Sequence, residues 1–412
     1  MRPTRTHLAT ACAAGIATAA VIATPNPASA EISDGVVRIG VLTDMSGPFS
    51  DNVGAGSVLA AQMAVEDFGG TVAGAPIEIV SADHQNRADV GSTLARRWFD
   101  AEGVDMITEM VSSAVALSVQ ELARERNRMA IHTGPGTPQL TGEACSPVGF
   151  HWAYDNYAYA NVVASAIVDR GLDEWFFLTV DYSFGHTLEE SATHFVEQAG
   201  GRILGRVRHP LGASDFSSFL LQAQASGASV IGLASAGTDM TNSLMQANEF
   251  GLIEAGQAVA SLLVNLPDIH ALGLQDAQGL MLADSFYWNM TDETRAWSER
   301  FMERFDGRAP GSLQAAVYGA VMHYLKAVEA TGTDDAAVVA EAMRQMPIED
   351  FYTDGGVIRE DGRVLRDMYL FQVKSPDQSS GPWDYYEHLA TIPGEQAFRP
   401  LADGGCPLVD GG

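Results

Sequence analysis

Apolar positions along this chain alternate between short runs typical of strands and longer runs with helical spacing. Val37, Ile39 and Val41 form a β-branched run that ends at the polar turn 46–48. Beyond this turn, apolar residues recur on one face of a predicted helix, at Val58, Ala61, Val65 and Phe68. A strand that ends in this way presents its loop at the carboxyl edge of a parallel sheet, where α/β folds bind ligands.

The same alternation continues through two series of similar length. In the first series we predict strands at 77–80, 104–108 and 128–132, with helices at 90–101 and around 115–122. In the second series we predict strands at 175–180, 203–207, 230–233 and 258–263, separated by helices at 185–199, 216–226 and 240–250; a helix at 157–171 precedes them. Strands separated by helices of ten to fifteen residues indicate βαβ units and mainly parallel sheets.

The pattern changes after a strand at 280–283. Helices are predicted at 293–305, 312–331 and 335–345, followed by a β-hairpin over 355–373 with its turn at Glu360-Asp361-Gly362. The sequence contains no internal repeat and no low-complexity segment. We therefore predict an α/β protein of two Rossmann-like lobes with parallel central sheets.

The first thirty residues have the composition of an export signal. Arg2 and Arg5 precede a short apolar run, and Ala28-Ser29-Ala30 is typical of a cleavage site. We predict a signal peptide over 1–30, a mature chain that begins at Glu31, and a periplasmic protein. Cys12 as a lipoprotein cysteine is the weaker alternative, because the apolar run before it is too short.

The net charge of the mature chain argues against two classes of partner. Without residues 1–30 the chain has 22 Lys and Arg against 52 Asp and Glu, a net charge of −30. It therefore has no basic surface with which to displace counterions from nucleic acid, and an anionic membrane surface would repel it. An acidic surface keeps an exported protein soluble and monomeric.

Two cysteines, Cys145 and Cys406, remain in the mature chain. In an oxidising compartment we expect them to form one disulfide that ties the C-terminal tail to the first third of the chain. Two free thiols are the alternative. A catalytic cysteine is not expected, because no histidine partner can be assigned to either residue.

Several segments together resemble one family. They are IGVLTDMSGPFSDNVGAG at 39–56, AAQMAVEDFGG at 60–70, VSSAVALSVQELA at 111–123, TGPGTPQLTG at 133–142, FFLTVDYSFG at 176–185 and ANEFGL at 247–252. Their order and spacing resemble the type I periplasmic solute-binding proteins of ABC importers, of the leucine/isoleucine/valine-binding-like family. The sequences around HQNRADV, LTGEACSP and WFFLTVDYSFG are most similar to those of members that take up aromatic acids.

The resemblance implies two lobes joined by three crossovers, with the ligand enclosed between them. We expect crossings near 152–154, 284–286 and 349–353. Lobe 1 would then comprise 31–153 plus 285–350, and lobe 2 would comprise 154–284 plus 351–412, with the tail returning to lobe 1 through the disulfide. The partners implied are a small carboxylate ligand and a membrane permease/ATPase complex, with no cofactor.

Two loops have the chemistry of a carboxylate cradle. Ser112 and Ser113 stand between a strand and the next helix, and Gly134 to Thr137 follow the neighbouring strand. Hydroxyls and free N–H groups at a helix N-terminus can hold an anion, and small residues let the backbone approach it. The resemblance assigns the ligand carboxylate to Ser112, Ser113, Gly134 and Thr137. Helix capping by Ser113 and a plain turn at 134–137 are the alternatives.

Aromatic and apolar residues provide candidates for the rest of the site. Phe49, Tyr157 and Phe184 could hold a ring from both lobes, although each could also be core packing. Family members that bind amino acids carry an acid in lobe 2, whereas this chain has Leu262 and Leu263 in that region. Where the resemblance predicts a tyrosine in contact with the ligand, this chain has the small residues of the segment 236–238, which ends at Thr238. Their small side chains leave room for a larger ligand. These departures favour an amino-free carboxylate, because a buried ammonium without a partner is costly.

No catalytic or metal-binding motif stands out, so we expect no enzyme activity. The leading hypothesis is the substrate-binding component of an ABC importer for an aromatic or other amino-free carboxylate. The alternatives are a branched-chain amino acid receptor, a sensory module for a signalling partner, and an exported α/β enzyme.

Overall fold

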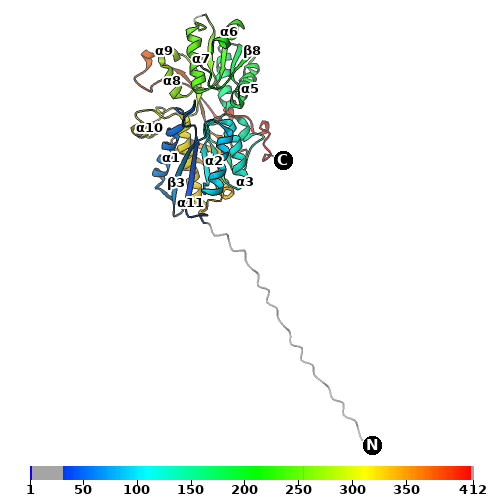
Figure 1. The fold of residues 1–412 in the computed structure, drawn as a ribbon, viewed down its shortest axis with the longest axis vertical. Coiled ribbons are helices and arrows are strands. Elements are labelled where there is room, and N and C mark those ends of the chain that lie inside the picture. The colour runs from blue at the N-terminus through cyan, green and yellow to red at the C-terminus, as the bar shows by residue number, and fades with distance from the viewer. Residues whose placement is uncertain (2–30, 254, 410–412) are drawn as a thin grey trace. The chain divides into compact units, whose positions relative to one another are not determined.

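The computed structural model describes residues 1, 31–253 and 255–409. The predicted signal peptide, with Cys12, lies outside the described residues. From Glu31 onward the chain forms one compact unit. Its helices gather around two sheets, with α1, α2, α3 and α11 at one end of the ribbon and α5, α6 and α7 at the other (Figure 1).

The first sheet has six strands in the order β2-β3-β1-β4-β5-β6, of which all but β2 are parallel. Its strands are β1 (Val37–Thr43), β2 (Thr71–Val72), β3 (Ala75–Asp83), β4 (Met106–Glu109), β5 (Met129–His132) and β6 (Gly149–His151). The helices between them are α1 (Gly54–Phe68), α2 (Ala88–Ala101), α3 (Ser113–Arg126) and the 3₁₀ turn η1 (Pro138–Thr141). The predicted elements of this series are confirmed; β2 and β6 are additional, and both are too short to show alternation.

The second sheet is parallel, in the order β10-β9-β7-β8. Its strands are β7 (Glu174–Val180), β8 (Arg202–His209), β9 (Val230–Ala234) and β10 (Ala258–Ser261). Its helices are α4 (Asn156–Val168), α5 (Ser183–Gln198), α6 (Ser217–Ala225), α7 (Gly237–Glu249), α8 (Leu266–Leu272) and α9 (Leu274–Ala277). Two parallel sheets with helices on their faces confirm the predicted fold class.

The helices that follow return to the first sheet. They are α10 (Asp292–Arg304), α11 (Ser312–Thr331) and α12 (Ala336–Gln345), and α11 packs along α1 and α12. Most side chains of α11 are buried, because it lies between the first sheet and two other helices. A segment from the last third of the chain thus completes the core of the first sheet.

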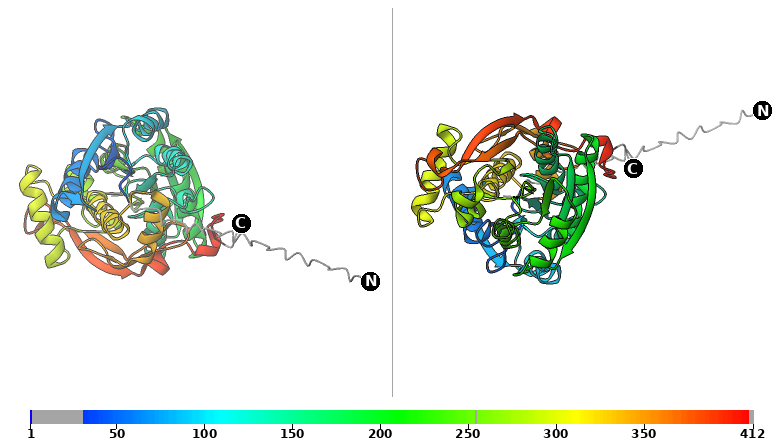
Figure 2. Two further views of the ribbon diagram at one scale, coloured as in Figure 1. Left: turned by 90° about the horizontal axis from the view of Figure 1, so that it is seen from below. Right: turned by 90° about the horizontal axis from the view of Figure 1, so that it is seen from above.

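The predicted hairpin over 355–373 is only partly correct. β13 (Asp354–Ile358) and β14 (Val364–Leu365) do pair around the turn at 360–362, with β12 (Ile348–Glu349) beside them. β15 (Met368–Val373) instead pairs antiparallel with β11 (Met281–Asp284) and β16 (Tyr386–Ile392). β15 and β16, drawn in orange and red, follow one side of the fold in both views of Figure 2. The distant strands β11 and β16 supply pairing partners that local patterning cannot reveal.

The C-terminal segment is fixed to the body of the protein. Short helical turns α13 (Gly394–Ala397) and η3 (Leu401–Asp403) lead to Cys406, which is bonded to Cys145 with a Cα–Cα distance of 5.6 Å. Asn161 of α4 donates to the carbonyl of Gln396 at 2.8 Å. The predicted disulfide is confirmed.

Candidate functional site

Loops that follow strands of the two sheets meet around a small, mostly apolar cavity. Its volume of about 20 Å³ is roughly the space of one water molecule. The lining side chains come from the loops around the first sheet and from α11 (Phe49, Asn52, Val111, Tyr154, Leu313) and from loops and helix starts of the second sheet (Tyr182, Phe184, Ala236, Leu263, Asn265). As it stands, this cavity has no room for a ligand much larger than water.

Asp44 shapes the loop that carries Phe49. Its carboxylate accepts hydrogen bonds from the N–H groups of Gly47 at 2.7 Å and Phe49 at 3.1 Å. This turn reverses the chain after β1 and places Phe49 in the cavity with only 5% of its surface exposed. Phe49 therefore lines the cavity, and its predicted contact with the ligand stays a prediction.

The start of α3 offers unpaired polar groups. Ser112, rather than Ser113, is the N-cap, and its side chain makes no capping hydrogen bond. Ser113 is the first helical residue; its hydroxyl is buried and has no hydrogen-bond partner among the described residues. The first N–H groups of an α-helix lack intrahelical acceptors and carry a partial positive charge. The prediction that Ser113 is the N-cap is therefore wrong, while the anion-binding chemistry predicted for this helix start remains available.

Strained backbone precedes that helix. Glu109 and Met110 have φ values of +79° and +58°, a region that costs side-chain-bearing residues energy. The Glu109 carboxyl is fully buried, and burial raises its pKa well above the ordinary value. It lies against Gly134, where an added Cβ would be 2.2 Å from Oε1 of Glu109. Gly134 is thus required by close packing, and burial favours the neutral form of the Glu109 carboxyl.

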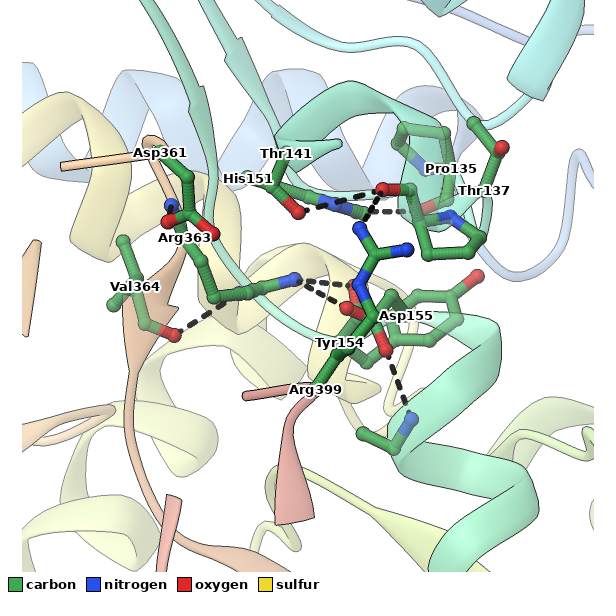
Figure 3. A network of polar contacts seen from close by, with 12 residues as sticks. Pro135, Thr137, Thr141, His151, Tyr154, Asp155, Asp361, Arg363, Val364 and Arg399 are labelled. Carbon is green, nitrogen blue, oxygen red and sulfur yellow. Dashed lines mark hydrogen bonds and ion pairs between the residues drawn. The ribbon is translucent and has the colours of Figure 1, made fainter. Parts of the chain in front are cut away.

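The loop 134–137 is held from several sides. Tyr154 donates from its hydroxyl to the carbonyl of Gly134 at 2.7 Å. His151 Nε2 donates to the carbonyl of Pro135 at 2.7 Å (Figure 3). The Thr137 hydroxyl accepts from the N–H of Gln139 and caps η1. Thr137 is thus the N-cap of η1, and its hydroxyl is already engaged.

Asn156 links this loop to the start of α5. Its Nδ2 donates to the carbonyl of Phe184 at 3.1 Å and to Thr187 Oγ1 at 2.7 Å. An added Cβ at Gly136 would be 2.2 Å from the Asn156 amide oxygen. Phe184 is consequently fixed against the loop, 5% exposed, and lines the cavity as predicted.

Of the nine predicted site residues, only Phe49 and Phe184 line this cavity. Ser112, Ser113, Gly134 and Thr137 lie in the two loops described above, and the other three lie elsewhere. Tyr157 faces a different cavity, lined also by Thr187, His194 and Arg399, because the first turn of α4 directs it toward α5. Thr238 is exposed in the first turn of α7. Leu262 is buried in the core, and its neighbour Leu263 lines the cavity.

Sequence reasoning missed four polar or aromatic residues of the cavity. Tyr154 and Tyr182 stand near the ends of β6 and β7 and take the place proposed for Tyr157. Asn52 and Asn265 add amide groups, and Asn265 begins α8 with a capping box. An aromatic residue just after a buried strand was the available signal for Tyr182; no sequence signal distinguished the two asparagines.

Comparison with known proteins identifies the family. The family described as Periplasmic binding protein matches residues 36–381. The chain belongs to the periplasmic binding protein family. This is a family of solute-binding proteins rather than enzymes, and it places the chain in the periplasm. Within the described residues, no helix is long and apolar enough to cross a membrane.

Individual members are similar over most of their length. A crystal structure of a periplasmic binding protein from Burkholderia mallei has 48% identity and a TM-score of 0.89, and the match covers 92% of this chain and all of that one. A second crystal structure is that of a branched chain amino acid ABC transporter periplasmic ligand-binding protein from Burkholderia xenovorans LB400. It has 40% identity and a TM-score of 0.81, and the match covers 90% of this chain and 99% of that one. The Leu/Ile/Val-binding protein homolog 6 of Brucella suis is 25% identical over 86% of this chain and 91% of its own length.

Solute-binding proteins whose structures hold an aromatic acid have lower sequence identity to this chain. A solute binding protein of an ABC transporter from Rhodopseudomonas palustris HaA2, in complex with p-hydroxybenzoic acid, has 20% identity and a TM-score of 0.79, covering 87% and 97% of the two chains. At that identity the likeness extends to the fold alone. The Leu/Ile/Val-binding-like resemblance is therefore confirmed, and the finer resemblance to aromatic-acid members remains a prediction.

Proposed function

We propose that this protein binds, for an ABC importer, a small molecule that combines a carboxylate with an apolar body. The observation that carries the proposal is the buried hydroxyl of Ser113 at the start of α3, which has no partner among the residues that the structure describes. It lies close along the chain to a cavity lined by Val111 and four aromatic rings. A buried hydroxyl without a partner is costly, so a ligand that supplies an acceptor would stabilise the closed protein.

The apolar body has two candidate forms. A branched-chain amino acid is the first, because the relative of 40% identity carries that description, and because Asn265 adds a polar group near the predicted position of an ammonium partner. An aromatic acid without an amino group is the second, because Phe49, Tyr154, Tyr182 and Phe184 offer flat apolar surface. The sequence-based preference for the second rested on the absence of an acid beside Leu262 and Leu263.

Binding would work through closure of two lobes. The proposed crossings near 152–154, 284–286 and 349–353 would join lobe 1, 31–153 plus 285–350, to lobe 2, 154–284 plus 351–412. Ligand contacts made by both lobes favour the closed form only to the extent of their differential affinity for it. The proposed partner of the closed form is the permease of the importer, and the proposed working state is a monomer.

A thermal-shift screen tests the proposal. We expect leucine, valine, isoleucine, benzoate and cinnamate to include at least one compound that raises the melting temperature in a saturable way. Mass spectrometry of the same samples should recover the ligand unchanged, whereas steady conversion would favour the exported-enzyme alternative. No stabilisation by any of these five carboxylates would contradict the proposal.

A further inference from the structure

Asn52 connects the cavity to the buried carboxylate of Asp268, which lies in α8 beside the second sheet. It stands in the loop after β1, is 4% exposed and lines the cavity. Its Nδ2 donates to Asp268 of α8, at 3.2 Å from Oδ1 and 3.4 Å from Oδ2. The first sheet and the α8 region of the second are joined by this contact.

Asp268 fixes the orientation of the Asn52 amide. Asp268 also accepts from the N–H of Asn265 at 2.8 Å, as part of the capping box of α8. An ionised carboxylate only accepts hydrogen bonds, so the NH₂ group of Asn52 must face Asp268 and the carbonyl oxygen must face away from it. That oxygen is buried and has no hydrogen-bond partner within the part of the chain that the structure describes.

We propose that Asn52, oriented by Asp268, is the residue that selects ligands carrying an N–H or O–H donor on their apolar body. This inference rests on the proposed function and deepens it. We expect Asn52 to favour carboxylates that bear an amino or hydroxyl group. The plain acid, which has the same shape but lacks that group, should bind more weakly. The physical reason is that a plain acid leaves a buried acceptor unpaired in the closed protein, which costs affinity.

The state of Asp268 makes this selection depend on pH. Burial raises the pKa of Asp268 to about 6. The other groups that act on this carboxylate are Asp51, which is paired with Arg308 at 2.7 Å, and the neutral phenol of Tyr386. His270, two residues along α8, has its Nδ1 2.7 Å from the Tyr385 hydroxyl, and burial lowers its pKa.

The direction of this dependence follows from hydrogen-bond chemistry. Above pH 6 the carboxylate is ionised and holds the amide oxygen of Asn52, a residue of the cavity wall, away from Asp268. Below pH 6 a protonated Asp268 can donate to that oxygen, so the amide is free to turn and offer its NH₂ group instead. Discrimination in favour of donor-bearing ligands should therefore weaken as the pH falls through about 6.

Calorimetry with matched ligand pairs tests the inference. The pairs are leucine with 4-methylpentanoate and 4-hydroxybenzoate with benzoate, measured at pH 7.5 and 5.5. We expect the wild-type protein to prefer the donor-bearing member of at least one pair by roughly 5- to 100-fold at pH 7.5, and by less at pH 5.5. Asn52→Leu, which is similar in size, should bring the ratio close to one at both pH values.

Asp268→Asn provides the matched second variant. It keeps the size of the side chain but removes the charge that orients Asn52, so the preference should fall and its pH dependence should disappear. This variant also keeps the inference testable if Asn52→Leu does not fold. Equal affinities within each wild-type pair, or a preference that survives in the variant, would overturn the inference and leave the proposed function intact. Failure of the wild-type protein to bind any member would overturn the proposed function itself.

Discussion

The guanidinium of Arg363 donates a hydrogen bond from Nη1 to the carbonyl oxygen of Tyr154 at 3.0 Å (Figure 3). It also lies 3.5 Å from the carboxylate of Asp155, which caps α4. Three residues further along, Arg366 donates to the carbonyls of Ser285 and Tyr352. Two buried arginines thus bind all three segments in which we predict the crossovers, and this arrangement stabilises the region about which the lobes would move.

Replacing Arg363 should therefore destabilise the fold. Arg363→Met leaves Asp155 buried without its cation and the Tyr154 carbonyl without its donor, and we expect a loss of about 3–5 kcal/mol in the free energy of unfolding. Chemical denaturation measures this loss. Arg304→Met, which removes an exposed pair with Glu66, is the matched control and should cost less than about 1 kcal/mol. Equal effects of the two substitutions would contradict the structural role of Arg363.

The disulfide should stabilise the protein through the length of chain it closes. Cys145 and Cys406 are 261 residues apart, so their bond strongly restricts the unfolded chain. We expect the double variant Cys145→Ser/Cys406→Ser to lose about 2–5 kcal/mol in the free energy of unfolding. Peptide mapping of the non-reduced wild-type protein should recover the linked peptide. Two alkylatable thiols in protein prepared from the periplasm would rule the bond out.

Ser113 and Thr137 should respond differently to removal of their hydroxyls. Ser113→Ala should weaken ligand binding by about 1–3 kcal/mol and leave stability nearly unchanged, because that hydroxyl has no partner among the residues described. Thr137→Ala should mainly lower stability, by about 1 kcal/mol, because that hydroxyl caps η1.

Calorimetry and thermal unfolding on the same samples separate these two effects. Ser118→Ala, in the same helix as Ser113 but bonded to the carbonyl of Ala114, is the control for binding. If Ser113→Ala binds as tightly as this control, the ligand is held elsewhere.

Burial of His132 should make the protein sensitive to mild acid. Burial lowers its pKa to about 3, against about 6.5 in an unfolded chain. Between these values the unfolded state binds more protons, so stability falls by about 1.4 kcal/mol per pH unit as the pH drops below 6.5.

A variant without this histidine isolates its contribution. His132→Gln keeps a polar group near Gln120, whose amide oxygen lies 2.9 Å from Nε2 of His132. We expect the wild-type protein to lose about 2 kcal/mol more than His132→Gln between pH 7 and pH 5. Denaturant titrations at the two pH values measure the difference. Parallel losses in both proteins would mean that His132 does not titrate in this range.

The two sheets could be predicted because each buried strand and each amphipathic helix has its own local pattern of apolar residues. Phe49 and Phe184 could be placed for the same reason, since each follows a strand that ends at the ligand edge. The choice of Leu262 over Leu263 failed by one residue because β10 ends at Ser261 and strand alternation ends with it. The assignment of Tyr157 failed because a helix start, and not a strand end, determines the direction of its side chain.

Other features depend on contacts between distant segments. β15 finds its partners in β11 and β16, and Asn52 finds its partner in Asp268, which lies 216 residues away. Such pairings are fixed only when the whole chain folds. Local sequence patterns accordingly predicted the sheets and the strand-end loops that carry Phe49 and Phe184, but not the amide of Asn52 that we propose determines selectivity.

Calorimetry with acids and their amides tests the central claim most directly. Leucine with leucinamide, and benzoate with benzamide, differ mainly in the carboxylate that Ser113 and the start of α3 are proposed to hold. We predict that at least one acid binds with a measurable heat, that its amide binds at least about tenfold more weakly, and that Ser113→Ala narrows this ratio. An acid and amide of equal affinity in the wild-type protein would contradict the account.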